Sequence, residues 1–517
     1  MWCAGWRFSF DGAHMKTQSP QQTRDVDVPT RLQSPTLLLV LLALWLVATL
    51  GLRPLLLPDE GRYASVAYEM LMGNALVPTL NGLPFFHKPP LFYWLDMAAM
   101  QLFGINAFAA RASSMLGAWL MGMSLFLAMR RWHGPRVAAL ALGVLATCPF
   151  FFIGAQYANH DMLVAGLITV AVLSLAVAVE QSPRVHLGWL LMGSAACALA
   201  MLAKGLIGFV LPVLVVGPWL LAQGRWRQLI GLLHPLGLLV FFAIAAPWFV
   251  LTQIAYPDFF DYFFVEQHFR RYAQSSFNNV QPFWFYFALL PALMLPWSAW
   301  LPQAFKRAWT ARDSRVGLYV WWVIAIVGFF SLPSSKLAGY VLPAAAPWCA
   351  LLTLAIARGS TRLWQWVLAG SAVLCLVLVA VIAWQAPKSS RAAALVLASR
   401  MAPNDKVVMI DEYFYDLPFY ARLKKPVIIA SDWADPDLAL RDNWRKELFD
   451  ATRFAPVLGA EILRPLDALD KLLCGQVAVW FVVHPKQAER LDGLAGITRE
   501  FANTNVELWR APAHACP

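Results

Sequence analysis

Long apolar runs alternate with short polar segments over the first three quarters of the chain. A helix that crosses a membrane needs about 20 mostly apolar residues, and eleven stretches reach or approach this length. They lie near 36–53, 107–129, 137–154, 163–180, 188–203, 205–222, 229–251, 283–301, 316–332, 341–357 and 364–385. The stretch 90–106 predicts either an interfacial helix or a partial span. We therefore expect a polytopic α-helical membrane protein with about 11 spans and at most about 13.

The pattern changes after residue 385, where short β-rich runs alternate with polar, helix-like segments. The runs are KVVMI at 406–410, PVIIA at 426–430, VAVWFVV at 477–483 and VELW at 506–509. Short runs of β-branched and aromatic residues between turn signals are typical of strands. Three parts are therefore predicted: a polar tail over 1–35, a membrane domain over 36–385 and a small α/β domain over 386–517.

Basic residues are distributed unevenly over the loops between the spans. The inner loops of membrane proteins carry the excess of Lys and Arg. With the N-terminus inside, the short inner loops hold 12 Lys and Arg, whereas the outer loops hold 6 together with 8 acidic residues. This asymmetry places the first large loop, 54–106, and the α/β domain on the outer face. The formal net charge of +11 is then mainly a topology signal, and no nucleic-acid partner is needed to explain it.

Composition supports a membrane protein. Hydrophobic residues make up 59% of the chain and charged residues 14%, against roughly 45–50% and about 25% in soluble domains. A soluble enzyme, a disordered scaffold and a disulfide-stapled secreted module are therefore excluded. The 7 Cys show no CxxC or Cys/His spacing, so no zinc module is expected. A disulfide between Cys474 and Cys516 is a hypothesis, since they are the only cysteines in the predicted α/β domain.

The first outer loop, 54–106, opens with the sequence PDEGRYA. Pro58 suits the first position of a helix, and acidic residues suit its first turn because they meet the positive end of the helix dipole. On such a helix Asp59, Arg62 and Tyr63 share one face, at positions i, i+3 and i+4. The pattern predicts a short helix on the membrane surface with a carboxylate, a guanidinium and a phenol at one end.

A further basic group follows in the same loop, in the sequence HKPPLFYWL. Lys88 precedes Pro89, and a residue before proline is biased away from the helical region. Its ammonium is therefore held on a stiff, extended segment, which suits contact with a phosphate. The alternative is that the acids of this loop only cap a helix and that its basic side chains only form ion pairs or reach lipid headgroups.

These motifs, with their spacing, resemble the aminoarabinose transferase and protein O-mannosyltransferase group of the GT-C glycosyltransferases. The matching sequences in the loop are PDEGRYA, VPTLNG and HKPPLFYWL. Further matches are Phe103, Gly104, Arg111, Asp161, LAKG at 202–205, His268, SKL at 335–337, Tyr340 and Pro343. The resemblance covers about residues 55–350. His87 departs from it, because relatives often carry an acidic residue before the lysine.

The resemblance implies a GT-C fold and a sugar donor linked to undecaprenyl phosphate, used on the periplasmic face of a bacterial inner membrane. The sugar would be aminoarabinose-like or a hexose, and the favoured acceptor is a lipid A phosphate. Asp59 would be the catalytic or essential acid, and Asp161 in the next outer loop would support it. With a phosphate acceptor, Asp59 would orient the acceptor or bind a sugar amine; with a hydroxyl acceptor it would be the general base.

Basic residues on the outer face are candidates for holding the donor phosphate, because positioned cations stabilise the charge that develops on a leaving group. Together with two tyrosines, the candidate substrate-binding residues are Arg62, Tyr63, Lys88, Lys204, Arg270, Arg271, Lys336 and Tyr340. Lys204 and Lys336 adjoin apolar spans, so the alternative for both is anchoring at the membrane boundary.

Histidines give a weaker signal. His87 and His268 fall on the outer side, but no His-x-x-x-His spacing supports a metal site. We therefore expect no cofactor, and a divalent cation at these two histidines is the alternative. The expected partners are the polyprenyl-linked donor, a lipid or glycan acceptor and membrane lipids.

Other functions stay open at this point. The same fold can glycosylate a protein or another envelope glycan. A membrane transporter would place polar groups near the bilayer midplane, whereas here the spans are nearly free of charge and the polar groups gather on one face. A non-catalytic envelope assembly protein would not require Asp59, Lys88 and Asp161.

Overall fold

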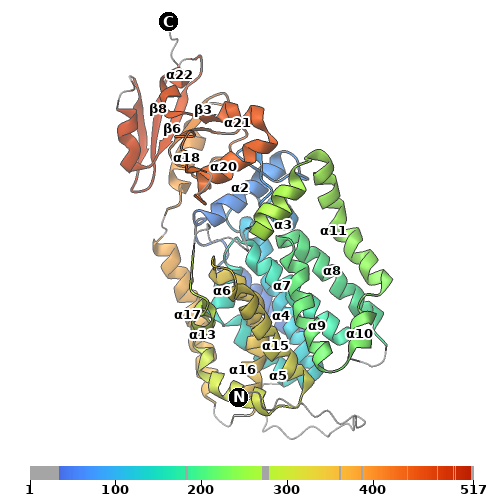
Figure 1. Ribbon diagram of the computed structural model, residues 1–517. Coiled ribbons are helices and arrows are strands. Elements are labelled where there is room, and N and C mark those ends of the chain that lie inside the picture. Colours follow the sequence, from blue (N-terminus) through green and yellow to red (C-terminus); the bar gives the residue numbers. More distant parts are fainter. Residues whose placement is uncertain are drawn as a thin grey trace, which may run out of the picture.

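Two parts follow one another along the chain: a bundle of apolar helices and a smaller α/β domain at one end of it (Figure 1). The computed structural model describes residues 34–180, 184–270, 279–359, 362–385, 388–438, 441–473, 475–492, 494 and 496–513. Nearly all of the predicted polar tail over 1–35, and both Cys474 and Cys516, lie outside these residues.

Seven of the described helices are long and apolar enough to cross a membrane. They are α4 (Ala112–His133) with the short 3-10 helix η2 (Ala109–Arg111) before it, α7 (His160–Ala178), α8 (Leu187–Lys204), α11 (Pro235–Ala255), α15 (Ser314–Ser331), α16 (Ala345–Ile356) with η5 (Ala338–Ala344) before it, and α17 (Leu363–Gln385). The prediction of a polytopic helical membrane protein is confirmed.

The other predicted spans are bent or short. Helix α5 (Pro135–Ala146) meets α6 (Pro149–Ala155) at 67°. Helix α13 (Phe285–Leu293) meets the segment Trp297–Thr310, made of η4 (Trp297–Trp300) and α14 (Leu301–Thr310), at 108°. Each break carries a proline, which cannot donate the backbone hydrogen bond that would continue a helix. Helices α1 (Pro35–Val47) and α9 (Ile207–Ala222) are apolar but shorter.

Helix α7 lies at the centre of the bundle, and nearly all of its residues are buried. It packs against α4 and α8. A Cβ added to Gly166 would lie 2.0 Å from the carbonyl oxygen of Gly117 on α4, so only glycine allows this approach. Close packing through small residues is how helices associate in a bilayer. It fixes the position of the first residues of α7, which are polar.

The first outer loop folds as α2 (Asp59–Met72), a hairpin of β1 (Thr79–Leu80) and β2 (Leu83–Pro84), and α3 (Leu91–Phe103). With 13 residues, α3 is too short to cross a membrane and packs on α2. Helix α2 has the predicted acidic first turn. The sequence predicted that this helix would lie on the membrane surface, and its position in the structure is different. It is largely buried between the bundle and the α/β domain, where Ser65 donates a hydrogen bond to the Tyr415 carbonyl at 2.5 Å.

The α/β domain contains a six-stranded sheet in the order β5-β4-β3-β6-β8-β7. The strands are β3 (Lys406–Ile410), β4 (Ile428–Ala430), β5 (Leu463–Arg464), β6 (Val479–Val483), β7 (Thr498–Ala502) and β8 (Glu507–Ala511). Strands β3 to β6 pair in parallel, and β8 pairs antiparallel with both β6 and β7. All four predicted runs are strands, and the prediction of a C-terminal α/β domain is confirmed.

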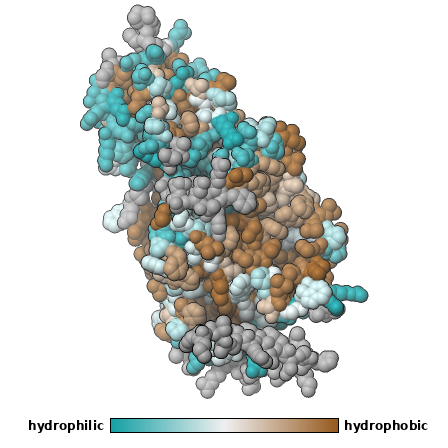
Figure 2. All heavy atoms as spheres, viewed as in Figure 1, coloured by the Kyte–Doolittle hydropathy of each residue, from teal (hydrophilic) through white to brown (hydrophobic). Residues whose placement is uncertain are grey.

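Helices flank this sheet and complete the domain: α18 (Arg391–Arg400), α19 (Leu417–Ala421), α20 (Trp444–Ala451), α21 (Pro456–Ile462) and α22 (Leu469–Leu473). Figure 2 shows that the visible face of the domain is mainly hydrophilic, whereas much of the visible face of the bundle is hydrophobic. This contrast is expected where a bundle meets lipid and an attached domain meets water.

Candidate functional site

A cavity of about 730 Å³ lies where the bundle meets the α/β domain. From the bundle side it is lined by the predicted residues Asp59, Arg62, Tyr63, His87, Lys88, Asp161, Lys204 and Tyr340. These residues come from α2, from the segment after β2, from the start of α7, from the end of α8 and from η5. Segments far apart in sequence thus bring two carboxylates and three cations to one cavity.

Asp59 stands at the first position of α2 and is the more open of the two carboxylates, with 32% of its side chain exposed. Its Oδ1 lies 3.5 Å from the Arg62 guanidinium, one turn further along the same helix. Its Oδ2 accepts a hydrogen bond from the Tyr157 hydroxyl at 3.3 Å. Burial raises the pKa of Tyr157, so this phenol keeps its proton and acts as a donor.

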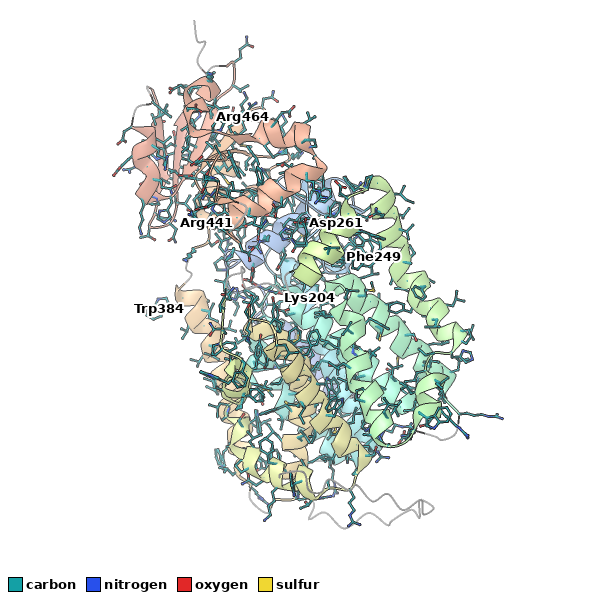
Figure 3. The ribbon with its side chains drawn as sticks, viewed as in Figure 1. Lys204, Phe249, Asp261, Trp384, Arg441 and Arg464 are labelled. Atoms are coloured by element: carbon teal, nitrogen blue, oxygen red, sulfur yellow. The ribbon has the colours of Figure 1, made fainter. Side chains whose placement is uncertain are left out.

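Asp161 stands in the first turn of α7, where Asn159 caps the helix by accepting from the Asp161 backbone N–H at 3.1 Å. Its carboxylate forms an ion pair with Lys204 at the end of α8. The Lys204 ammonium also lies 4.7 Å from the centre of the Tyr340 ring. Lys204 marks the end of the bundle that faces the α/β domain (Figure 3).

Arg62 connects α2 to the α/β domain. Its Nε lies 3.2 Å from Glu447 Oε2 on α20, and its guanidinium carbon lies 4.9 Å from the centre of the Tyr415 ring. The Tyr415 hydroxyl donates to the same Glu447 oxygen at 2.5 Å. Burial raises the pKa of Glu447, although the charge of Arg62 opposes that rise. The α/β domain is therefore tied directly to the helix that carries Asp59.

Glu60 lies next to Asp59 but is fully buried on the other side of α2. It accepts from Arg111 Nε at 2.8 Å and from Arg53 Nη2 at 3.1 Å, as well as from the backbone N–H groups of Leu56 and Ala158. Burial alone would raise the pKa of Glu60, but the charges and hydrogen bonds of Arg111 and Arg53 lower it to about 2. This buried cluster anchors the start of α2.

Two predicted groups have a different environment from the one expected. Lys336 does not line the cavity: it is 3% exposed, and its ammonium donates to the backbone carbonyls of Gln281 at 2.9 Å and of Pro333. The ammonium of Lys336 thus has two backbone carbonyl partners, and its assignment to the donor phosphate stays a prediction. His87 lines the cavity but stacks on Phe85, with ring centres 4.3 Å apart.

The remaining predicted residues lie on or after the π-helix η3 (Asp261–Arg270). Arg271 lies outside the described residues, and the side chains of His268 and Arg270 are also not described. Among the residues that the structure describes, no group of three or more His, Cys, Asp or Glu could hold a metal ion.

Sequence reasoning missed the wall of the cavity that the α/β domain supplies. This wall includes Lys388, Glu412, Tyr413, Phe414, Tyr415, Asp442, Asn443, Trp444, Glu447, His484, Lys486, Gln487 and Asn505. The aromatic run at 413–415 is the one signal in the sequence that points to this wall. Tyr157 was also missed, since a lone tyrosine in a short loop carries no pattern.

The chain is similar in sequence to known glycosyltransferases. A family model described as dolichyl-phosphate-mannose-protein mannosyltransferase matches residues 87–250. A relative from Erwinia tasmaniensis, named undecaprenyl phosphate-alpha-4-amino-4-deoxy-L-arabinose arabinosyl transferase, is 38% identical over 316 residues, which cover 60% of this chain and 57% of the relative. A Pseudomonas fluorescens relative, named as a second transferase of this kind, is 35% identical over 330 residues, or 62% of this chain and 59% of the relative.

Solved structures extend the similarity over nearly the whole chain. The crystal structure of ArnT from Cupriavidus metallidurans bound to undecaprenyl phosphate superposes with a TM-score of 0.80 at 24% identity, covering 93% of this chain and 99% of that one. The chain has the GT-C fold. The resemblance predicted from the first outer loop is confirmed. The archaeal oligosaccharyltransferase AglB from Archaeoglobus fulgidus is a more distant neighbour, with a TM-score of 0.52 at 14% identity over 88% of this chain and 70% of that one.

The sequence matches are partial, since the chain spans less than two thirds of the length of each of these arabinosyl transferase relatives. The matched region of the family model contains Lys88, Asp161 and Lys204 but begins after Asp59. The cavity and its charged residues therefore carry the functional argument, and the relatives' names indicate which chemistry to test.

Proposed function

We propose that the protein is an inner-membrane glycosyltransferase that moves a sugar from undecaprenyl phosphate to an acceptor on the periplasmic face. The observation that carries the proposal is the cavity at one end of the bundle, where Asp59 and Asp161 meet Arg62, Lys88 and Lys204. The names of the arabinosyl transferase relatives favour an aminoarabinose-like sugar and, as acceptor, a lipid A phosphate.

The proposed reaction is a displacement at the anomeric carbon of the donor sugar. An acceptor oxygen forms the new bond to that carbon, while the bond between the carbon and the donor phosphate oxygen breaks. Polyprenyl phosphate leaves with the bonding electron pair. Cations held in a water-poor cleft stabilise the negative charge that develops on the leaving phosphate.

Asp59 is proposed to act on the substrate, because it lines the cavity and is more exposed than Asp161. An acceptor phosphate needs no deprotonation, so Asp59 would orient it or hold a sugar ammonium. With a hydroxyl acceptor, Asp59 would take the proton as general base. Asp161 is proposed to support the reaction by holding Lys204 in place.

Lys88, Lys204 and Arg62 are proposed to surround the donor phosphate. Lys88 lies on the rigid segment before Pro89-Pro90, and Lys204 lines the same cavity from the end of α8. Arg62 is shared between Asp59 and Glu447, so it connects the phosphate side of the cavity with the α/β domain. Tyr63 and Tyr340 complete the lining and are proposed to contact the substrate.

The proposed topology follows from α7, which has Asp161 at its start. Glu180, just past its end, forms ion pairs with Arg131 at 2.6 Å and Arg315 at 3.1 Å. The 19 residues of α7 extend roughly 28 Å, close to the hydrocarbon thickness of a bilayer. The cavity and the arginine-rich end therefore lie on opposite membrane faces, and the basic end is the cytoplasmic one.

We further propose three functional parts: a cytoplasmic tail over 1–35, the membrane domain over 36–385 and a periplasmic α/β domain over 386–517. The α/β domain would supply the outer wall of the cavity and select the polar head of the acceptor, because its residues face the cavity opposite Asp59 and Lys88.

A transfer assay with purified protein tests the proposal, using undecaprenyl-phosphate-linked aminoarabinose as donor and lipid A as acceptor. Asp59→Asn keeps the size of the side chain and removes its charge. We expect it to lower transfer by at least about 100-fold, the scale of one well-placed catalytic group. Asp258→Asn is the matched control, because this acid is 61% exposed and does not line the cavity.

An Asp59→Asn enzyme as active as the parent would contradict the proposal. Mass spectrometry of lipid A from cells with and without the gene identifies the acceptor. Unchanged lipid A alongside newly glycosylated protein or glycan would move the assignment to another acceptor, and movement of the donor across vesicles without a new glycosidic bond would indicate a transporter.

A further inference from the structure

A second cavity, of about 390 Å³, lies at the side of the molecule between the bundle and the α/β domain. Its lining includes Gly51, Phe103, Arg391, Leu395, Tyr420 and Arg422. None of these residues lines the cavity that contains Asp59. We call this second space the lateral cavity.

The lateral cavity lies where membrane helices end. Gly51 follows shortly after α1, Phe103 precedes the span that begins at Ala109, and Arg391 follows shortly after α17. Trp384, in the last turn of α17, is 87% exposed, as is common for tryptophan at a membrane interface (Figure 3). The cavity is therefore at the depth where lipid headgroups meet lipid chains.

Three arginines line this space, but Arg53 is buried in an ion pair with Glu60, so two of the three are exposed. Arg391 and Arg422 both line it and both are exposed. Among the residues that the structure describes, neither guanidinium has a carboxylate within ion-pair distance, whereas Arg400 on the same helix as Arg391 pairs with Glu500. Two arginines of like charge at one cavity, without an acidic partner, suit a bidentate anion such as a phosphate.

Apolar side chains from both parts of the molecule also line this cavity. Phe103 is 57% exposed and Leu395 is 52% exposed, and the neighbouring Leu102 is 78% exposed. Large apolar side chains that remain exposed beside cations match the two halves of an amphiphile: a charged headgroup and the start of its acyl chains. A soluble anion would make no use of the apolar side.

The back of the cavity is fixed to the loop that leads to Asp59. The guanidinium carbon of Arg391 lies 5.9 Å from the centre of the Tyr420 ring, and the Tyr420 hydroxyl accepts a hydrogen bond from the Leu55 backbone N–H at 2.8 Å. Arg391 is thus connected through Tyr420 to the segment that precedes Asp59.

We propose that the lateral cavity binds the phosphate of an anionic phospholipid of the surrounding membrane through Arg391 and Arg422. The bound lipid would be neither the sugar donor nor the acceptor, since the site is separate from the Asp59 cavity. It would hold the α/β domain against the membrane surface beside α3.

Native mass spectrometry of the full-length protein in detergent tests this inference, with phosphatidylglycerol and phosphatidylcholine as probes. We expect the parent to bind phosphatidylglycerol more tightly. The double variant Arg391→Gln/Arg422→Gln should weaken phosphatidylglycerol binding by at least about tenfold, the scale of one lost charge-assisted contact. Phosphatidylcholine binding should change little.

Lys424→Gln/Lys425→Gln is the matched control. It removes two positive charges next to Arg422, but these lysines do not line the cavity. An equal loss of phosphatidylglycerol binding in this control would overturn the inference, because general charge would then explain the selectivity. Arg391→Lys/Arg422→Lys should restore part of the binding.

Two measurements on the parent protein remain decisive even if the double variant does not fold. Equal affinity for the two lipids would overturn the inference. Inorganic phosphate at concentrations similar to those of the lipid should not displace phosphatidylglycerol; full displacement would identify a plain anion site instead of a lipid site. Because no readout is sugar transfer, failure here is distinguishable from failure of the proposed function.

Discussion

Lys204, the last residue of α8, forms an ion pair with Asp161 in the first turn of α7. The two residues belong to neighbouring membrane helices, and each side chain is about nine-tenths buried, with 10% exposed. Sequence reasoning gave them separate roles, one as a supporting acid and one as a phosphate ligand. Their contact makes them one ion pair that sets the position of a cation at the cavity.

This pairing predicts coupled effects of mutation. Asp161→Asn should lower transfer because Lys204 loses its orientation, and Lys204→Met should lower it because a cation is lost. The double variant should be less impaired than the product of the two single effects, with a coupling energy of about 1–3 kcal/mol. The ratio of kcat/KM values in a double-mutant cycle measures it, and strictly multiplicative effects would contradict the pairing.

Glu60→Gln tests the anchor of α2. The position of this side chain, away from Asp59 around the helix, predicts a milder effect on transfer than that of Asp59→Asn, whereas its buried ion pairs predict a large effect on stability. The substitution leaves Arg53 and Arg111 buried without their shared carboxylate. Breaking a buried ion pair costs about 3–5 kcal/mol, so the melting temperature in detergent should fall clearly. Glu461→Gln, on the exposed surface of α21, should leave it unchanged.

The same carboxylate predicts a pH dependence of stability. The pKa of Glu60 is about 2 in the folded protein, below its ordinary value of 4.5. For an acid with a lowered pKa, the stabilisation is complete above pH 4.5 and is lost as the pH falls towards 2. It amounts to roughly 3 kcal/mol. Melting temperatures of parent and Glu60→Gln should converge over this acidic range, and a constant difference would refute the assignment.

Gly166→Ala tests the central helix crossing. The added Cβ would lie 2.0 Å from the Gly117 carbonyl oxygen, so α7 must move away from α4. Because α7 carries Asp161, we expect both a lower melting temperature and a loss of transfer. Gly217→Ala is the matched control in another apolar helix, since nothing lies within 4 Å of its added Cβ.

Reporter fusions test the topology. A fusion after residue 310 should report a cytoplasmic location, and fusions after residues 60 and 386 should report a periplasmic one. The physical basis is the excess of Lys and Arg in the inner loops, 12 against 6. A reporter that is active in the cytoplasm after residue 386 would reverse the orientation and remove the periplasmic reaction.

The features that the sequence predicted are local ones. Apolar length predicted the helices, and alternating β-branched runs predicted β3 and β6. Helical spacing placed Asp59, Arg62 and Tyr63 on one face, and all three line the cavity. Strand β7 was missed because its sequence, TREFA, is polar and sits at the edge of the sheet.

The features that could not be predicted depend on contacts between distant segments. Glu447 reaches Arg62 from the other part of the molecule, and no pattern in the sequence joins them. Lys336 follows an apolar span, as Lys204 does, yet its ammonium turns back to the carbonyls of Gln281 and Pro333. Whether a lysine at the end of a span faces a cavity or the backbone depends on the fold of the next turn.

The residues that line the cavity with Asp59 extend along the chain to Asn505. Proteins are synthesised from the N-terminus, and their parts generally fold in that order. A nascent chain therefore contains Asp59 and Asp161 long before Glu447 and Asn505 have been synthesised. The cavity is therefore complete only after residue 505 has been synthesised, and a shorter nascent chain lacks its enclosed geometry.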